Sequence, residues 1–324
     1  ALNGYGVWSL VGQRIVQVLV NTVLAWFAVS WRPHLRASWP HVREIMGMGR
    51  TVLLLRGAQI ARIQIPMALI GALLGPVALG LFSLAWRLVE IASFLVSTPM
   101  RMVSQSAFAT QLRRGQSGGP MLVEISRLSG WIALPALLGL SVLAEPIVML
   151  VFGEAWLGAA PILTIIALVG AYQAIEMIHQ SYCLAAGRVV ELTWVAWTEV
   201  IIAAGLVGWA AGYGLEAVSW AFVASFVLLW VVRFHIVSRV ADLPLMTLPA
   251  QHLFPVLASL VMAVSVNRVL AWTGMSSGFA ALFVGAVIGM AIYLALTSIF
   301  MRSRLELAGH YLLNRPSSTG EEAS

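Results

Sequence analysis

Long apolar stretches recur along the whole chain and are separated by short polar connections. Crossing the hydrocarbon core of a bilayer takes about 20 apolar residues in a helix. Stretches of that kind fall at roughly 7–30, 51–74, 79–103, 128–144, 162–185, 192–211, 217–237, 254–272 and 279–300. The strict alternation of a transmembrane β-barrel is missing from the sequence. Helices satisfy every backbone group within their own segment. The pattern therefore predicts an all-α, polytopic membrane protein with about nine transmembrane helices.

Polar residues inside four of these spans fall on one face of each predicted helix, since successive residues turn by about 100°. Buried charges in a bilayer usually face a bundle interior or a water-filled cavity. The four stripes therefore predict a shared cavity. They consist of Gln13, Arg14, Gln17 and Asn21; of Arg56, Gln59 and Arg62; of Ser83, Arg87, Glu90, Ser93 and Ser97; and of Gln173, Glu176, His179 and Gln180.

The second stripe contains the residues whose insertion into a bilayer costs the most free energy. An arginine near the bilayer centre costs about 2.5–3.5 kcal/mol on insertion scales, and Arg62 lies near the middle of its span. We read Arg56 and Arg62 as unpaired cations that serve a ligand. The predicted substrate-binding set is Arg56, Arg62, Gln59, Arg87, Glu90, Arg14, Gln17 and Glu176.

Structural alternatives stay open for several polar residues. Arg87 and Glu90 are one turn apart, so they fit a plain ion pair as well as a binding site. Glu176 fits a proton or ion site, or a carboxylate satisfied by neighbouring helices. His179 is more typical of a hydrogen-bonded core residue than of a ligand. Glu199 stands alone among apolar residues, and the sequence offers no account of it.

Composition narrows the class of protein. Hydrophobic residues make up 60% of the chain and charged residues 10%, whereas soluble domains have about 25% charged residues. Cys183 is the single cysteine, which excludes an internal disulfide. The sequence has no phosphate-binding loop, no nucleophile–base pair and no cluster with metal-ligand spacing. We therefore expect no enzyme, no metal and no cofactor.

The distribution of arginine between spans predicts the orientation. Basic residues lie in the connections after the first, third, fifth, seventh and ninth spans, and the other connections are nearly free of them, with Arg268 as the exception. By the positive-inside rule the arginine-bearing connections are cytoplasmic. The chain then starts outside and ends inside. Because the basic residues trace a membrane surface and form no single patch, we expect no nucleic-acid partner.

Several segments resemble bacterial polysaccharide-biosynthesis flippases of the Wzx type, within the multidrug/oligosaccharidyl-lipid/polysaccharide exporter superfamily. The matching segments are "GYGVWSLVGQ" (4–13), "WRPHLR" (31–36), "LIGALLGPVALGLFSLAWRL" (69–88), "VFGEAWLGAAPIL" (151–163) and "LAAGR" (184–188). The resemblance implies a two-lobe fold of which this chain is mostly the C-terminal lobe, with about five helices preceding it. Many relatives carry an aspartate near the position of Pro66, so carboxylate coupling there is in doubt.

The resemblance also implies a domain division. Residues 1–31 would end the N-terminal lobe, and residues 32–50 would form a cytoplasmic linker along the membrane surface. The six-helix C-terminal lobe would be 51–237, followed by a connection and two extra helices (238–300). We expect the tail, 301–324, to be cytoplasmic and disordered.

The function implied by the resemblance is export of oligosaccharide on a polyprenyl pyrophosphate carrier, by alternating access in the bacterial inner membrane. It serves lipopolysaccharide or exopolysaccharide synthesis. The expected partners are lipid-linked oligosaccharide and membrane lipids, with polysaccharide polymerase and chain-length machinery as candidates. A drug/cation antiporter of the same superfamily is the alternative, although its cavity should be acidic. A membrane polysaccharide polymerase is less favoured, because the connections are too short for a catalytic domain.

Overall fold

The computed structural model describes residues 8–28, 38–275 and 278–313. The chain divides into two compact units, Ala1–Gly49 and Arg50–Ser324. The first unit contains helix α1 (Trp8–Ala28) and the start of α2 (Trp39–Arg113). Residues 39–50 are helical and pass into the next span without a helix break, while 32–37 of the predicted linker lie outside the described residues. The course of this linker along a membrane surface stays a prediction.

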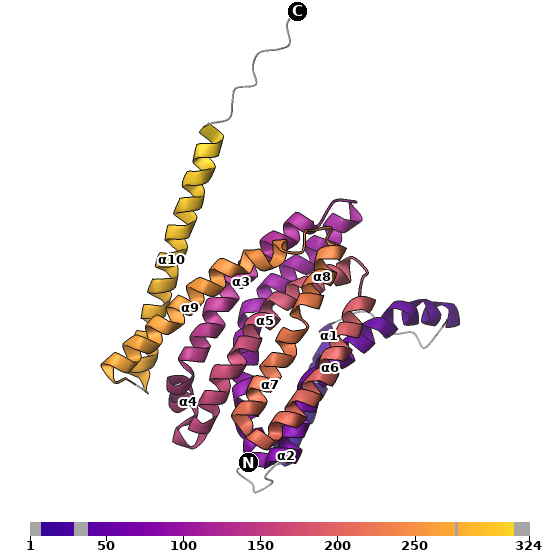
Figure 1. Cartoon of the computed structure of the whole chain (residues 1–324). Coiled ribbons are helices and arrows are strands. Elements are labelled where there is room, and N and C mark those ends of the chain that lie inside the picture. Colours follow the sequence, from indigo (N-terminus) through magenta and orange to yellow (C-terminus); the bar gives the residue numbers. More distant parts are fainter. Residues whose placement is uncertain (1–7, 29–37, 276–277, 314–324) are drawn as a thin grey trace, which may run out of the picture. The chain divides into compact units, whose positions relative to one another are not determined.

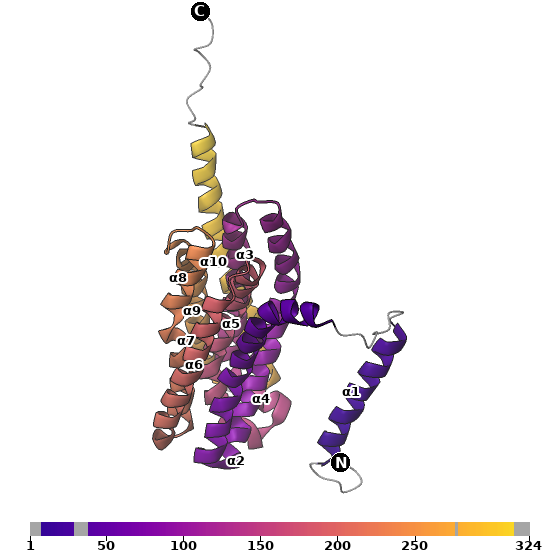
Figure 2. The same ribbon diagram turned by 90° about the vertical axis from the view of Figure 1, so that its right-hand side faces the viewer.

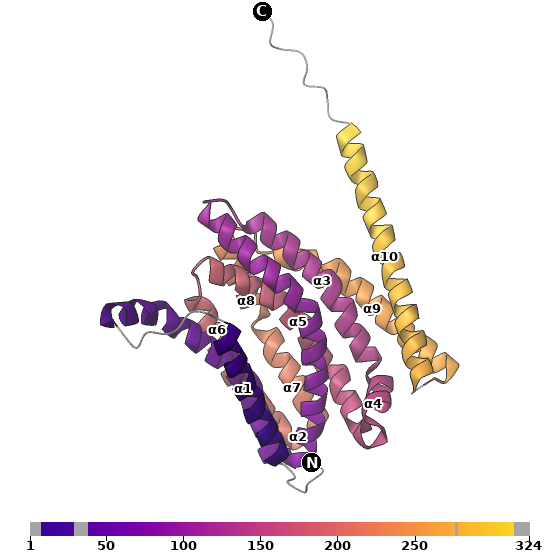
Figure 3. The same ribbon diagram turned by 180° about the vertical axis from the view of Figure 1, so that it is seen from behind.

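Helix α2 is a hairpin of two helical arms that meet at Gly75. Gly75 has φ 89° and ψ 177°, a backbone conformation open mainly to glycine. Pro76, which follows it, suits the first turn of the second arm. The turn is tight, because a Cβ on Gly71 would lie 2.9 Å from a methyl group of Leu79. Figure 3 shows both arms, and they correspond to the predicted spans 51–74 and 79–103.

The remaining elements of the second unit are also helical. They are α3 (Gly119–Val142), α4 (Ala144–Phe152), the 3-10 helix η1 (Glu154–Ala159), α5 (Ala160–Ala185), α6 (Val190–Ala210), the 3-10 helix η2 (Ala211–Tyr213), α7 (Leu215–Leu228), α8 (Trp230–Val240), α9 (Thr247–Thr273) and α10 (Phe279–Leu313). The predicted span 217–237 is thus broken at Leu229 into α7 and α8.

Within the described residues, seven helices are long and apolar enough to cross a membrane. One of the seven, Gly49–Arg113, contains two predicted spans, and α1 is not among them. The prediction of an all-α, polytopic membrane protein is confirmed. Trp194, Ile201 and Trp209 on α6 are 72%, 71% and 69% exposed, as expected of side chains that face lipid.

Two connections and the C-terminal tail differ from the sequence-based expectation. The segment 144–159 was expected to be a loop and forms α4 and η1. The connection expected over 238–252 shortens to 241–246, because α8 ends at Val240 and α9 begins at Thr247. Helix α10 continues to Leu313, into the segment expected to be disordered, since residues 301–313 are rich in good helix formers.

Helix α5 is the central element of the second unit. It packs against α3, α7 and α8, and its apolar side chains join one core with those of the second arm of α2. Ile162, Leu163 and Ile166 are buried among them. Figure 1 shows α5 between α3 and α7, and Figure 2 shows the same bundle with the arms of α2 beside it.

Candidate functional site

The arms of α2 and helix α5 line an open polar cavity of about 610 Å³. We call it the polar cavity; its polar and charged lining consists of Arg56, Gln59, Arg62, Gln64, Arg87, Glu90, Ser93, Ser97, Arg101, Gln105, Gln173, Glu176, Gln180 and Ser181. Four arginines against two glutamates leave a net formal charge of +2 on this lining. The polar cavity is therefore suited to an anion with hydrogen-bonding groups attached.

Six of the eight predicted binding residues line this cavity: Arg56, Gln59, Arg62, Arg87, Glu90 and Glu176. The other two, Arg14 and Gln17, belong to the first unit, where Arg14 Nη1 donates a hydrogen bond to Gln17 Oε1 over 3.1 Å. The convergence of three polar stripes follows from the hairpin at Gly75, which turns the two arms of α2 toward the same space. The assignment of these residues to a substrate stays a prediction.

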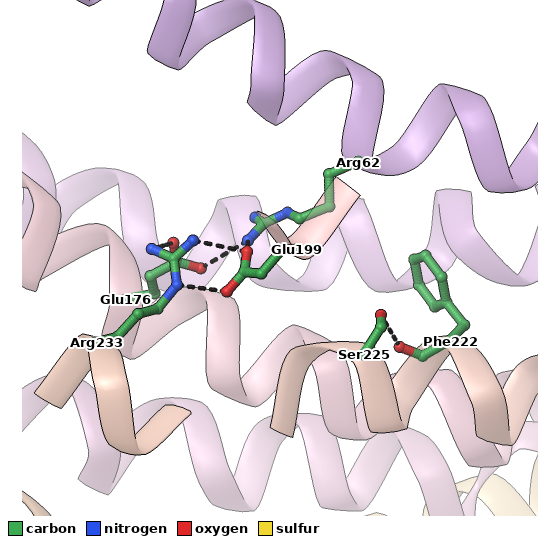
Figure 4. A network of polar contacts seen from close by, with 6 residues as sticks. All are labelled: Arg62, Glu176, Glu199, Phe222, Ser225 and Arg233. Carbon is green, nitrogen blue, oxygen red and sulfur yellow. Dashed lines mark hydrogen bonds and ion pairs between the residues drawn. The ribbon is translucent and has the colours of Figure 1, made fainter. Parts of the chain in front are cut away.

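Arg62 is held in a buried cluster of four charged residues, which we call the ionic cluster: Arg62, Glu176, Glu199 and Arg233 (Figure 4). Arg62 Nη1 lies 2.7 Å from Glu199 Oε2 and 3.3 Å from Glu176 Oε2. The four residues come from α2, α5, α6 and α8. The cluster thus ties four helices together at zero net charge.

Arg233 completes the cluster through both carboxylates. It donates from Nε to Glu199 Oε1 over 2.5 Å and from Nη2 to Glu199 Oε2 over 2.6 Å, in the two-pronged geometry that favours guanidinium–carboxylate pairs. Its Nη1 also lies 2.6 Å from Glu176 Oε1. Glu199 is 1% exposed, so its charge is compensated entirely by protein groups.

These contacts correct the interpretation of Arg62 as an unpaired cation. Glu199, for which the sequence offered no account, is its nearest counter-ion, and Glu176 is indeed satisfied by neighbouring helices. The guanidinium carbon also lies 4.6 Å from the ring centroid of Phe226, a cation–π contact. Sequence reasoning missed Arg233, although a charged residue within a predicted span was itself a signal.

Arg56 and Arg101 are the lining arginines without a carboxylate partner among the described residues. Arg56 Nη1 donates to Gln59 Oε1 over 3.1 Å. Sequence reasoning also missed Arg101. It lies fourteen positions after Arg87, which is about 40° away on a helix that turns by about 100° per residue. The polar stripe on the second arm of α2 therefore extends farther than expected.

Arg87 and Glu90 form an ion pair of 2.9 Å, with side chains 70% and 54% exposed. Exposed pairs of this kind contribute about 0.2–1 kcal/mol, so this pair does little for stability. Since both residues line the polar cavity, the structural and the binding interpretations are compatible.

His179 is a hydrogen-bonded core residue, as its sequence context favoured. Ser126 Oγ lies 2.8 Å from His179 Nε2 and 3.1 Å from His252 Nε2. These contacts join α3, α5 and α9. His179 and His252 line a second, apolar cavity of about 220 Å³, which shares Glu176 and Gln180 with the polar cavity.

Comparison with known proteins shows that the chain is similar to proteins of polysaccharide biosynthesis. Residues 1–161 match a family described as polysaccharide biosynthesis protein. The chain is 27% identical over 316 residues to the succinoglycan biosynthesis transport protein ExoT of Rhizobium meliloti, covering 94% of this chain and 62% of that protein. The resemblance to polysaccharide-biosynthesis flippases is therefore confirmed.

Two further relatives agree with this. The teichuronic acid biosynthesis protein TuaB of Bacillus subtilis is 26% identical over 185 residues, or 56% of this chain and 38% of that protein. The solved structure of the lipid II flippase MurJ in an inward closed conformation matches with a TM-score of 0.66 at 15% identity, over 89% of this chain and 61% of that one. This likeness shows the exporter fold. The chain spans less than two thirds of the length of each of these relatives.

Proposed function

We propose that the protein transports a saccharide on a polyprenyl pyrophosphate carrier from the inner to the outer face of the bacterial cytoplasmic membrane, and that the polar cavity holds the pyrophosphate. The observation that carries the proposal is the net charge of +2 on a cavity within a bundle of membrane-spanning helices. A pyrophosphate diester carries two negative charges, so the lining matches its charge.

The chemistry of the lining supports the same ligand. Guanidinium groups bind phosphate oxygens through two parallel charge-assisted hydrogen bonds, which replace the hydration lost inside a membrane. Arg56 and Arg101 are the arginines best placed to bind the phosphate oxygens, because no carboxylate among the described residues forms an ion pair with them. Five glutamines also line the cavity, and their amides suit sugar hydroxyls.

The names of the relatives agree with this substrate class, because ExoT is a succinoglycan transport protein and MurJ a lipid II flippase. A drug/cation antiporter is disfavoured, since a cavity for cations should be acidic and this one is basic. Movement of the two lobes by alternating access, with the cavity exposed to each side in turn, is the mechanism we propose.

Binding to the purified protein in lipid nanodiscs tests the proposal. With a polyprenyl pyrophosphate sugar as ligand, we expect Arg56→Gln and Arg101→Gln each to weaken binding roughly ten- to a hundredfold, because each removes a charge-assisted bond of about 1.5–3 kcal/mol. Arg101→Lys should restore binding only in part, since a point charge cannot reproduce the two-pronged geometry.

Arg127→Gln is the matched control, because Arg127 forms an exposed ion pair with Glu124 and does not line the polar cavity. It should bind like the wild type. The same variants can be expressed in cells that lack the gene. The amount of polysaccharide on the cell surface, normalised to the amount of variant protein in the membrane, should follow the same order. Wild-type binding by Arg56→Gln, Arg101→Gln and their double variant would refute the headgroup site.

A further inference from the structure

The arginines that line the polar cavity lie at two different levels. Distance along either arm of α2 can be counted from Gly75, at about 1.5 Å per helical residue. On this count Arg62 and Arg87 lie about 20 Å and 18 Å from Gly75. Arg56 and Arg101 lie farther away, at about 28 Å and 39 Å. We call the first level the Gly75 end of the polar cavity and the second level the arginine end.

The charges at the Gly75 end balance one another. Arg87 pairs with Glu90 over 2.9 Å, and Arg62 pairs with Glu176 over 3.3 Å. All four side chains line the cavity, so two arginines are matched by two glutamates at this level. The net charge of +2 on the lining therefore belongs to the arginine end alone. An anion is attracted to the arginine end, whereas the Gly75 end suits an uncharged polar group.

Arg56 and Arg101 can reach a common level from the two arms of α2. Each Cα–Cβ bond of a helix tilts toward the N-terminus of that helix. The two arms run in opposite directions from the turn at Gly75. The tilt therefore directs Arg56 away from Gly75 and Arg101 toward it, which narrows the distance between their levels. A pyrophosphate can then lie between the two arginines.

Helix α5 runs along the cavity from the Gly75 end to the arginine end. It begins beside the turn of α2, because a Cβ on Gly158, just before α5, would lie 3.2 Å from a methyl group of Leu81. Glu176 lies farther along α5, at the level of the ion pairs. Gln173 precedes Glu176 by about one turn and also lines the cavity. Gln173 is therefore on the Gly75 side of these ion pairs.

Two glutamines with free amides lie at the Gly75 end. Gln64, on the first arm of α2, is about 16 Å from Gly75, and it lines the cavity together with Gln173. Neither side-chain amide has a hydrogen-bond partner within the residues that the structure describes. An amide offers donors and an acceptor, which are the groups that sugar hydroxyls need. Beyond Arg101, in contrast, the described lining contains a single polar residue, Gln105.

We infer that the headgroup lies at the arginine end and that the saccharide extends toward the Gly75 end, where Gln64 and Gln173 bind its hydroxyl groups. The inference rests on the proposed function, and it adds the orientation of the ligand and the residues that select its sugars. Arg56 and Gln64 are about 12 Å apart along the first arm. This distance is longer than a pyrophosphate group, so a saccharide is needed to reach Gln64. With the sidedness predicted from the sequence, the sugars precede the pyrophosphate toward the outer face.

Binding of two probes to the protein in lipid nanodiscs tests the inference. One probe is a polyprenyl pyrophosphate diester that carries a trisaccharide of neutral hexoses. The other carries a methyl group in place of the trisaccharide, so both probes have the same charge. The ratio of the two dissociation constants measures recognition of the saccharide apart from that of the headgroup. We expect the wild type to prefer the trisaccharide probe by roughly ten- to a hundredfold, because several neutral hydrogen bonds are added.

Gln64→Leu and Gln173→Leu should each lower this preference by roughly two- to tenfold, because leucine has a similar volume and forms no hydrogen bond. Affinity for the methyl probe and the melting temperature should not change. Arg101→Gln should weaken the binding of both probes by the same factor and keep the preference. Gln116→Leu is the matched control, since Gln116 is an exposed glutamine that does not line the polar cavity. It should bind both probes like the wild type.

A labelling experiment on the wild type needs no variant to fold. A diazirine on the terminal sugar of the trisaccharide probe reacts on illumination with the residues beside it, and mass spectrometry locates the attachment. We expect attachment close to Gln64 or Gln173. Attachment close to Gln105 would show that the ligand lies the other way round and would overturn the inference.

The other outcomes separate the inference from the proposed function. Equal affinity of the wild type for the two probes overturns the recognition of the saccharide and leaves the headgroup site intact. An equal loss for both probes in Gln64→Leu and Gln173→Leu, or no loss in either, overturns the assignment of these residues to the saccharide. Absence of binding of both probes to the wild type overturns the inference together with the proposed function.

Discussion

Arg56 and Arg62 look alike in the sequence, since both are arginines on one face of an apolar helix, but their surroundings differ. Arg62 is compensated by two glutamates, whereas Arg56 has only the amide of Gln59. The free-energy cost of burying the Arg62 charge is therefore offset by ion pairs within the protein. Its removal would leave two carboxylates facing Arg233 alone, so Arg62 is not the unpaired cation that the sequence suggested.

A prediction at this scale concerns the ionic cluster. Glu199→Leu leaves two buried arginines with one carboxylate and should destabilise the protein by about 3–5 kcal/mol, the cost typical of breaking a buried ion pair. The double variant Glu199→Leu/Arg233→Met retains the neutral Arg62–Glu176 pair and should recover most of this loss. Thermal unfolding of the detergent-solubilised protein measures both.

The exposed Glu124–Arg127 pair gives the matched control, because its loss in Glu124→Leu should cost no more than about 1 kcal/mol. If Glu199→Leu unfolds at the wild-type temperature, or the double variant is less stable than the single one, the cluster does not hold the helices together.

The sequence was sufficient to identify which side chains share a helix face, but it could not identify their partners. Arg56, Gln59 and Arg62 form a stripe by periodicity alone, and the structure places all three on one cavity. The pairing of Arg62 with Glu199 joins positions 137 residues apart, which no local pattern reveals. The helical periodicity also places Arg101 on the stripe of the second arm, but the sequence-based prediction ended that stripe at Ser97.

At the scale of the helices, close packing around α5 fixes the shape of the polar cavity. Gly170 lies where α5 meets both α3 and the second arm of α2. A Cβ there would lie 2.7 Å from methyl groups of Leu137 and Val89, and 2.8 Å from Ser93 Oγ. Ser93 itself lines the cavity. The absence of a side chain at Gly170 therefore sets how near α5, which carries Glu176, comes to the opposite wall.

We expect Gly170→Ala to destabilise the protein by about 1–3 kcal/mol, as overpacking does in a well-packed core. Gly205→Ala is the matched control, because Gly205 is also helical but has no atom within 4 Å of the added Cβ. It should leave the melting temperature unchanged or raise it, since alanine favours the helix. Equal melting temperatures for the two variants would show that α5 has room to shift.

The spans themselves were predictable, because length and hydropathy alone decide whether a helix can cross a bilayer. Helix ends and interruptions were not. The α7–α8 break at Leu229 contains no proline or glycine, and α4 forms where a loop was expected. Both features depend on packing against neighbouring helices, which a single sequence does not encode locally.

On the scale of the whole second unit, the two ends of the bundle differ in charge. The α2–α3, α5–α6 and α8–α9 connections lie on the same side in Figure 1. Arg114 and Arg188 lie in the first two of them, and Arg113 and Arg239 lie in the last turns of α2 and α8. Three turns of the opposite side, at Gly75, Gly153 and Gly214, carry no arginine. This alternation agrees with the arginine-rich side being cytoplasmic, and the sidedness stays a prediction.

Cysteine labelling in intact cells tests that sidedness. The native Cys183 is buried, so its background reaction should be small. Ser117 and Glu154 are exposed and mark the two ends, which makes them better sites than Gly118, where a side chain would strike Tyr182, or Gly153, whose φ is 82°. Since arginine-rich connections are retained inside, a membrane-impermeant maleimide should modify Glu154→Cys from outside and reach Ser117→Cys only after permeabilisation. Labelling of Ser117→Cys in intact cells would invert the predicted topology and place the arginine-rich end outside the cell.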